Sequence, residues 1–363
     1  MTTLQAERAA VAARPRAGIL GVGTAVPPSS YTQREILDIF GIEDPKIRSI
    51  FMQSAIERRF LHLPPESADG GRVMETQGEL LAKHKANGIE MGARAVQDCL
   101  KRAGAEPSDI RFLVCVTSTG FLTPGFSAHL IKELGLRPDT SRLDVVGMGC
   151  NAGLNGLTAT SGWAESHPGD LAVMVCVEAC SAAYVFDGTM RTSVVNSLFG
   201  DGAAAVALTC DPAAPGRGPQ VLRFASRIIP EAIGAMRYDW DDDQGKFSFF
   251  LDREVPYVVG ANVETVIGDL LAGTGLLPGD IDHWVVHSGG KKVIDSVMIN
   301  LGLTRYDVRH TTGVLRDYGN LSSGSFLFSY QRLAESGVIR PGEHLVLMTM
   351  GPGSTIETAL LRN

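Results

Sequence analysis

The feature that most constrains the fold is a connection that occurs twice, once in each half of the chain. Residues 105–110 and residues 277–281 both carry a Pro followed by an Asp-Ile pair. Each connection follows a predicted amphipathic helix, over residues 77–103 and 258–273, and leads into a short apolar run that predicts a buried strand. Because this order of elements repeats, we predict two similar α/β halves that pack together.

The length of 363 residues suits two halves of about 150–200 residues each. A Pro/Gly-rich stretch over residues 211–219 is the predicted linker. We therefore predict an N-terminal half over residues 18–211 and a C-terminal half over residues 219–363. Residues 1–17 are rich in Ala and Arg and are predicted to form a flexible arm.

Composition excludes several classes of function. The net charge of −7 argues against a nucleic-acid partner, since phosphate binding draws on clustered Lys and Arg. No stretch approaches the roughly 18 apolar residues of a membrane span, and the N-terminus lacks an apolar signal region. The six Cys lack the spacing of a zinc site, so we expect no metal and a reducing cytoplasm.

Cys150 is the strongest candidate for a nucleophile. A short apolar strand runs into Gly147-Met148-Gly149, and small residues after Cys150 can begin a tightly packed helix that lasts to about Trp163. Glycines permit a sharp turn, and the positive end of a helix favours a thiolate, the form that attacks a thioester. A small buried core thiol is the competing interpretation of Cys150.

Two polar residues in the second half strengthen the catalytic interpretation. His287 ends a predicted strand, at the edge where α/β sheets usually place ligands, and Ser-Gly-Gly follows it. Asn320 lies in a loop of small residues that leads to a helix. Taken alone, His287 fits a structural residue and Asn320 fits a turn or a helix cap.

Taken together, these segments resemble the type III polyketide synthases, the chalcone synthase-like family, over nearly the whole chain. The motifs that carry the resemblance are GCNAG around Cys150, His287 with Ser-Gly-Gly, YGNLSSG around Asn320, and the segments at 198–205 and 351–358. The resemblance implies a thiolase fold, in which two duplicated halves form five layers, αβαβα. It also implies a homodimer and a Cys-His-Asn catalytic centre.

The resemblance assigns roles to the three catalytic candidates. Cys150 accepts an acyl group from a CoA thioester, and His287 stabilises its thiolate as an ion pair. Malonyl-CoA then loses CO2, and His287 with the Asn320 amide stabilises the resulting enolate. Substrates are therefore malonyl-CoA and CoA thioesters, and no metal or redox cofactor is implied.

The resemblance also implies residues that contact substrate. Phe199 and Phe249 match two gate positions between the CoA tunnel and the cavity, although Phe249 also fits an ordinary core residue. Ala183 stands where plant relatives carry a cavity-lining Thr, and Ser322 belongs to the Asn320 motif. Lys46 matches a CoA contact of the family, while Ser49 and Gln53 replace two others. Lys291 and Lys292 are expected to compensate, or else to form a solvated turn.

A narrower resemblance is to the bacterial 3,5-dihydroxyphenylacetyl-CoA synthases of glycopeptide-antibiotic pathways. These enzymes condense malonyl-CoA units and cyclise a tetraketide through carbon–carbon closure while it remains a CoA ester. Separate crotonase-like pathway enzymes are possible partners. The motifs that carry this resemblance are EDPKIRS, SAIERRF, VTSTGFLTPG, DGTMRT, MRYDWD and HTTGVLRDYGNLSSGSFLFSY.

Several alternatives stay open at this point. Another type III synthase would make a different aromatic product, such as a tetrahydroxynaphthalene or an alkylresorcinol. A ketoacyl synthase III would carry His-Gln-Ala-Asn where this chain has His-Ser-Gly-Gly. A cysteine protease leaves the other motifs unexplained. A non-catalytic acyl-CoA-binding protein of the thiolase fold would have no reason to keep Cys150, His287 and Asn320 together.

Overall fold

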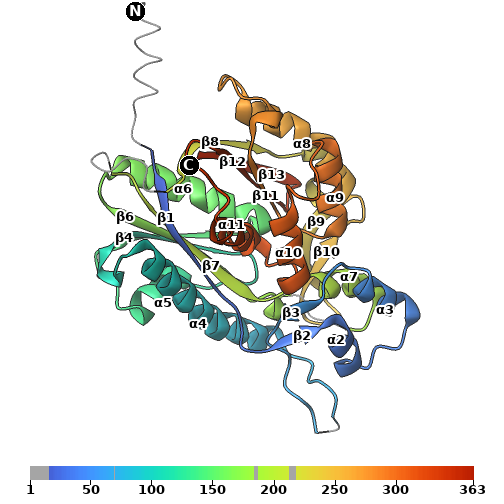
Figure 1. Ribbon diagram of the computed structural model, residues 1–363. Helices are drawn as coiled ribbons and strands as arrows, with labels where there is room; N and C mark the ends of the chain where they lie inside the picture. Colours follow the sequence, from blue (N-terminus) through green and yellow to red (C-terminus); the bar gives the residue numbers. More distant parts are fainter. Residues whose placement is uncertain (1–15, 69, 184–186, 212–217) are drawn as a thin grey trace, which may run out of the picture.

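The computed structural model describes residues 16–68, 70–183, 187–211 and 218–363 (Figure 1). The first half is built from β1 (Gly18–Ala25), α4 (Gln77–Ala103), β4 (Ile110–Thr117), α5 (Phe126–Glu133), β5 (Ser141–Val146), α6 (Ala152–Ser166), β6 (Leu171–Glu178) and β7 (Gly202–Thr209). The second half is built from β8 (Gln220–Arg227), α8 (Val255–Leu271), β11 (His283–Val286), α9 (Lys291–Asn300), α10 (Arg309–Tyr318), α11 (Ser325–Glu335), β12 (His344–Gly351) and β13 (Thr355–Arg362).

The strand pairing repeats between the halves. In the first half β4 is parallel to β6, β6 is antiparallel to β7, and β7 is antiparallel to β1. In the second half β11 is parallel to β12, β12 is antiparallel to β13, and β13 is antiparallel to β8. The predicted duplication is confirmed. The two sets of strands meet where Gly18 pairs with Gln220, which gives the order β11-β12-β13-β8-β1-β7-β6-β4-β5.

The helices complete five layers. Helix α4 packs on β1, β6 and β7 at one outer face, and α8 packs on β8 and β13 at the other. Helices α6 and α11 each contact strands of both halves, so they form the middle layer, as Figure 1 shows. The predicted αβαβα thiolase architecture is confirmed.

Local signals explain where the main helices begin and end. Thr76 and Glu79 cap α4 reciprocally, and Gly104 ends it with a left-handed φ of 66°, as the sequence predicts for residues 77–103. Helix α8 begins at Val255 rather than at residue 258. The prediction was three residues late because Pro256 is compatible with the first turn of a helix, where its missing N–H has no intrahelical partner.

Packing begins inside the predicted N-terminal arm. Ala17 is fully buried, its N–H donates to Glu165 Oε1 at 3.4 Å, and its carbonyl accepts from Val221 N–H at 2.9 Å. The last residue of the segment predicted as a flexible arm is therefore packed, because the backbone of Ala17 bonds with residues of both halves. Residues 1–15 of the arm, and residues 212–217 of the predicted linker, lie outside the described residues.

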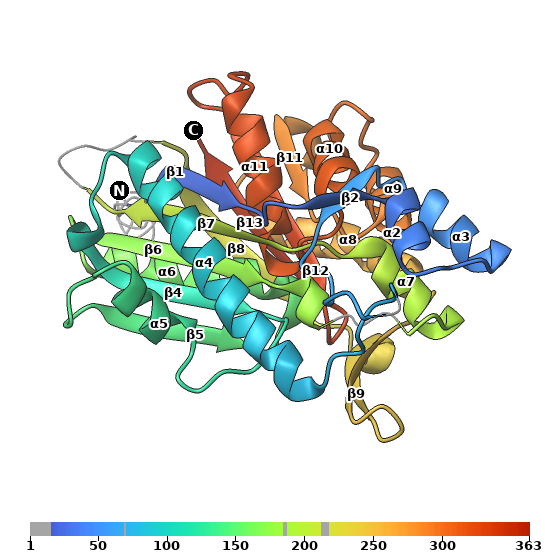
Figure 2. The same ribbon diagram turned by 90° about the horizontal axis from the view of Figure 1, so that it is seen from below.

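The elements outside the repeat gather at one end of the sheet. They are β2 (Ser30–Thr32), α2 (Gln33–Ile39), α3 (Pro45–Met52), β3 (Arg58–Phe60), α7 (Met190–Leu198), β9 (Met236–Asp241) and β10 (Lys246–Leu251). Helix α7 contacts both α3 and β10, and Figure 2 shows this group on one side of the molecule. Among the described residues, no helix has both the length and the apolar character that crossing a bilayer requires.

Candidate active site

Cys150 lies where the chain turns from β5 into α6. Gly147 and Gly149 have left-handed φ values of 82° and 77°, and a single 3₁₀ turn, Gly149–Asn151, leads into α6. The glycines therefore make the sharp turn that the sequence predicts. A Cβ on Gly149 would lie 2.3 Å from Pro352 Cδ, so the turn also needs glycine for close packing against the end of β12.

Two side chains from the 318–324 motif contact the thiol. Ser322 Oγ lies 3.2 Å from Cys150 Sγ, and a hydrogen bond from the Asn320 side chain also acts on the thiol. The Asn320 carboxamide oxygen accepts from Ser322 N–H at 2.8 Å and from Ser325 Oγ at 3.3 Å. With its oxygen engaged there, the amide presents its NH2 group to the sulfur.

His287 is brought to the same end of the sheet by strand pairing. It follows Val286, which pairs with Met348 of β12, and the end of β12 touches the Cys150 turn. A Cβ on Gly351 would lie only 2.9 Å from the backbone nitrogen of Cys150. His287 is 2% exposed, and its Nδ1 has no hydrogen-bond partner within the described part of the chain. The imidazole therefore keeps an unused polar group in the buried region beside the nucleophile.

Burial favours the neutral forms of both groups. It raises the pKa of the Cys150 thiol to about 12, while hydrogen bonds from Ser322 and Asn320 oppose that shift. Burial also lowers the pKa of His287 to about 4. A thiolate–imidazolium pair here therefore depends on the mutual attraction of the two charges, since each charge alone is disfavoured.

Sequence reasoning missed a buried carboxylate close to the thiol. Glu178, at the end of β6, accepts hydrogen bonds from the N–H and hydroxyl groups of Ser118 and Ser323. Burial nevertheless raises its pKa to about 7. The available signal was the position of Glu178 directly after the apolar run of β6, where a carboxylate is expensive to bury.

Glu178 is linked to the nucleophile through two hydroxyl groups. Ser118 Oγ donates to Glu178 Oε2 at 3.0 Å, and it lies 2.7 Å from Ser322 Oγ. Because Ser322 also contacts Cys150 Sγ, the hydrogen bonds form a continuous path from the thiol to the carboxylate. The negative charge of Glu178 also raises the pKa of the Cys150 thiol.

The two predicted gate residues lie in the same apolar cluster as Cys150. Cys150, Phe199 and Phe249 are members of one buried cluster, and Ala183 packs against it. The rings of Phe199 and Phe249 meet edge to face, with centroids 6.1 Å apart. A cavity of about 30 Å³ lies among Ala183, Val195 and Phe249, so little free space remains there.

A larger cavity, of about 530 Å³, adjoins this apolar cluster. The sequence did not predict it. Its lining includes Phe199, Val195 and Cys180 from the cluster, together with α2 and residues 59–64 and 70–75. It therefore shares a wall with the site around Cys150.

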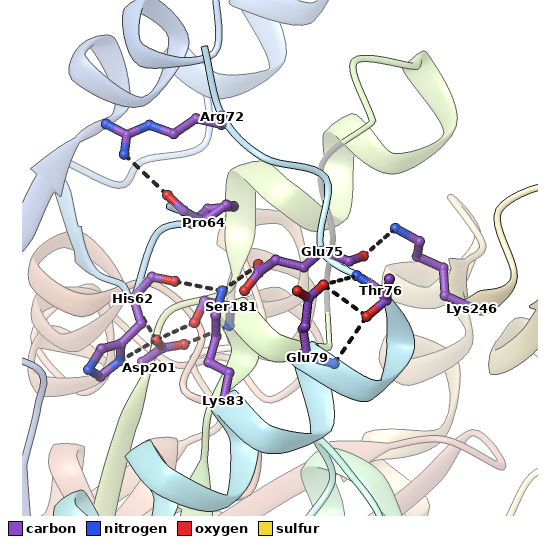
Figure 3. Close-up of polar contacts among 10 residues, drawn as sticks. All are labelled: His62, Pro64, Arg72, Glu75, Thr76, Glu79, Lys83, Ser181, Asp201 and Lys246. Atoms are coloured by element: carbon purple, nitrogen blue, oxygen red, sulfur yellow. Dashed lines mark hydrogen bonds and ion pairs between the residues drawn. The ribbon is translucent and has the colours of Figure 1, made fainter. Parts of the chain in front are cut away.

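Residues 62–68 and 70–75 form a segment that supplies part of the lining of this cavity. Figure 3 shows the polar contacts at its two ends, His62 and Glu75. Lys83 Nζ donates to Glu75 Oε2 at 2.5 Å and to the His62 carbonyl at 3.2 Å, which ties the two ends of the segment together. Buried Asp201 accepts from His62 N–H at 2.9 Å and from Ser181 Oγ at 2.6 Å. These contacts hold the segment against the body of the protein.

The three predicted CoA contacts lie on the surface. Lys46 is in the first turn of α3, and Lys291 and Lys292 begin α9. All three are exposed, and among the described residues none of them makes a hydrogen bond or an ion pair with the groups around Cys150. Lys291 forms an ion pair with Asp295 one turn along the helix. Because Lys291 is already paired, Lys292 is the better candidate of the two to bind a phosphate.

Comparison with known proteins agrees with this geometry. Residues 4–212 match the N-terminal domain of chalcone and stilbene synthases, and residues 221–363 match the C-terminal domain. The chain is 67% identical to a 3,5-dihydroxyphenylacetyl-CoA synthase of Streptomyces toyocaensis, over 99% of this chain and 93% of the relative. A synthase of the same name from Amycolatopsis balhimycina is 68% identical, over 94% and 92% of the two chains.

A solved structure supports the same assignment. The crystal structure of PKS-I from the brown alga Ectocarpus siliculosus has a TM-score of 0.88 and 25% identity, and the match covers 96% of this chain and 98% of that one. The two domain matches taken together, and each of the two relatives, extend over nearly the whole sequence. The chain therefore belongs to the chalcone and stilbene synthase family, the type III polyketide synthases.

Proposed function

We propose that this chain condenses malonyl-CoA units on Cys150 and cyclises the resulting tetraketide to 3,5-dihydroxyphenylacetyl-CoA. The observation that carries the condensing chemistry is the placement of a buried thiol at a helix N-terminus, beside the Asn320 amide and the Ser322 hydroxyl. The product assignment rests on the relatives that are 67% and 68% identical over nearly the whole chain.

The first step is acyl transfer to Cys150. The thiolate attacks the thioester carbonyl, the new S–C bond forms as the S–C bond to CoA breaks, and CoA leaves. His287 takes the thiol proton before the attack, so that an imidazolium lies beside the thiolate, and it returns that proton to the departing CoA sulfur. Ser322 and Asn320 support this step because their hydrogen bonds favour the charged form of the sulfur.

The second step is decarboxylation of malonyl-CoA. The bond to the carboxylate breaks, CO2 departs, and the electron pair becomes an enolate on the thioester. The Nε–H of His287 and the Asn320 amide donate to the enolate oxygen. Fixed donors in a site that excludes water stabilise such charge by several kcal/mol, on the order of 3 per donor.

Condensation then extends the chain. The enolate carbon attacks the Cys150 thioester, a carbon–carbon bond forms, and the sulfur is released for the next round. Phe199 and Phe249 belong to the apolar cluster that contains Cys150, and Ala183 packs against it, so we place the growing chain at this cluster. A final aldol-type closure within the tetraketide forms the ring while the product is still a CoA ester.

The substrate enters as a CoA thioester whose phosphates meet Lys46, Lys291 and Lys292. The two lysines of α9 lie at a helix N-terminus, where backbone N–H groups and the helix dipole also favour an anion. These residues supply charge, and the apolar cluster around Phe199 receives the acyl group.

We also propose a cytoplasmic homodimer, with separate crotonase-like enzymes acting on its product. Strand β5 lies at the end of the strand order, so one of its edges has no neighbouring strand among the described residues. Leu143, Val146 and Met148 are 39%, 41% and 37% exposed along and just after this strand. An open edge with apolar side chains is suited to pairing with a second copy. The six unpaired cysteines suit a reducing compartment.

The test is incubation of purified protein with malonyl-CoA alone, with CoA release and products followed by mass spectrometry. We expect 3,5-dihydroxyphenylacetyl-CoA or its free acid. Cys150→Ala should abolish malonyl-CoA consumption, whereas Cys99→Ala, a buried thiol on α4, should retain it. A different aromatic product would overturn the product assignment alone. No turnover with any of a panel of acyl-CoA starters would favour an acyl-CoA-binding protein.

A further inference from the structure

Arg59 is a buried cation that none of the proposed catalytic steps uses. It lies on β3 and is 2% exposed, among the largest fully buried side chains of the described chain. Burial lowers its pKa to about 9, which indicates a substantial desolvation cost. A buried guanidinium is retained only where its hydrogen bonds are well made.

The hydrogen bonds of Arg59 reach the backbone of the gate. Its Nη1 donates to the carbonyl of Phe199 at 2.8 Å. Its Nε and Nη2 both donate to Gln33 Oε1, at 3.2 and 2.9 Å. The guanidinium is therefore hydrogen-bonded on two sides, to Gln33 and to Phe199. Gln33 Nε2 in turn donates to the Ser197 carbonyl at 2.7 Å. The two side chains therefore fix both sides of the turn that carries the Phe199 ring.

The same turn is bonded to the backbone of Asn320. Phe199 and Asn320 form a parallel bridge, in which Asn320 N–H donates to the Leu198 carbonyl at 2.8 Å and Gly200 N–H donates to the Asn320 carbonyl at 3.0 Å. The Arg59 side chain also lies against Gly319, where a Cβ would come within 2.9 Å of Arg59 Cδ. Gly319 has a φ of 73°, so this close approach and its backbone conformation both need glycine.

We propose that Arg59 is a positioning residue of the condensation reaction, which sets the place of the Phe199 ring and of the Asn320 amide relative to Cys150. The inference rests on the roles proposed above for Phe199 and Asn320. The adjacent carboxylate, Asp201, keeps other partners without Arg59, because His62 N–H, Ser181 N–H and Ser181 Oγ all donate to it. Loss of the guanidinium therefore acts mainly on the turn that it holds.

The test compares Arg59→Met and Arg59→Lys with Arg58→Met, an exposed arginine one position earlier on the same strand. We expect Arg59→Met to lower kcat for malonyl-CoA about 100-fold, since a displacement of about 1 Å at a reacting group can have that effect, with KM changed less than threefold. Arg59→Lys should recover only part of kcat, because an ammonium cannot donate to Gln33 and Phe199 in the same fork. Arg58→Met should match the wild type.

A second readout does not depend on turnover. The rate at which iodoacetamide alkylates Cys150, followed by peptide mass spectrometry, should change at least fivefold in Arg59→Met and Arg59→Lys, with far-ultraviolet circular dichroism unchanged. Because Arg59→Lys keeps a buried cation, it serves if Arg59→Met does not fold. Wild-type kcat and wild-type alkylation in Arg59→Lys and Arg59→Met would overturn the inference. A wild-type protein inert toward malonyl-CoA, with alkylation still dependent on Arg59, would instead overturn the proposed function and leave the positioning role intact.

Discussion

The hydroxyl of Ser322 lies 3.2 Å from the sulfur of Cys150, although the two residues come from different halves of the chain. Ser322 is fully buried and has a left-handed φ of 48°, a backbone conformation that is unfavourable for a residue with a Cβ. The hydroxyl also lies 2.7 Å from Ser118 Oγ. Its position therefore joins the nucleophile to the polar group around Glu178.

Replacing this hydroxyl should make the thiol less acidic. The hydrogen bond from Ser322 lowers the pKa of Cys150, so Ser322→Ala should raise that pKa further. A hydrogen bond to a charged group contributes about 1.5–3 kcal/mol, so alkylation of Cys150 at neutral pH should slow by roughly 10- to 100-fold. The rate of alkylation between pH 6 and pH 10 measures the shift. Ser329→Ala, a buried serine on α11, is the control, and equal pH profiles for the two variants would contradict the expectation.

Glu178 should make stability depend on pH. Because burial raises its pKa in the folded protein to about 7, from 4.5, the folded state holds this proton more tightly than the unfolded state. The stabilisation of the folded state by this proton is therefore fully present below about pH 4.5, and it is lost as the pH rises towards 7. Glu178→Gln has no such proton, so its stability relative to the wild type should rise by about 3 kcal/mol between pH 5 and pH 8.

Urea unfolding at each pH measures this difference. The buried histidines, His84 and His287, have lowered pKa values of about 4 and oppose the trend, but they are present in both proteins and cancel in the comparison. Glu231→Gln, at an exposed position, is the control. If the curves of Glu178→Gln and the wild type run parallel, Glu178 does not change its protonation in this range.

Lys292 should contribute more than Lys291 to substrate affinity. Lys291 is already paired with Asp295, whereas Lys292 has no acidic partner among the described residues. Lys292→Ala should raise KM for malonyl-CoA about five- to tenfold, and Lys291→Ala less than twofold, in line with the modest value of an exposed ion pair. Steady-state kinetics at low and high salt measure both effects.

The same variants can be tested with a malonyl thioester of CoA that lacks its 3′-phosphate. If α9 meets that phosphate, the effect of Lys292→Ala should largely disappear with the truncated substrate, and the Lys291/Lys292 double alanine variant should behave in the same way. An undiminished effect on the truncated substrate would place the contact elsewhere on CoA.

Ala183 should control how long the polyketide grows. The cavity among Ala183, Val195 and Phe249 holds only about 30 Å³, so a Thr side chain at position 183 would fill it. Ala183→Thr should therefore release shorter products, such as triketides, while malonyl-CoA is still consumed. Mass spectrometry of the products measures the change. Ala82→Thr, exposed on α4, is the control, and an unchanged product from Ala183→Thr would show that residue 183 does not limit the length of the polyketide.

Local patterns in the sequence were enough to predict the main elements and the turn around Cys150. Helix α4 was predicted with both ends because its apolar period and its caps are local signals, and both are encoded within a few residues. The repeated Pro and Asp-Ile connections predicted the duplication because each half forms the same supersecondary unit. The glycines around Cys150 predicted the turn because their backbone freedom is a property of the residue type.

Which side chains meet depends on how distant segments pack in the folded protein. The contacts of Cys150 with Ser322, and of Arg59 with the Phe199 carbonyl, join segments far apart in the sequence. They depend on strand order and on how the two halves pack across α6 and α11, which no local pattern encodes. Burial decided the rest: Glu178 and Arg59 read as ordinary surface charges in the sequence, and their unusual pKa values arise because folding removes them from water.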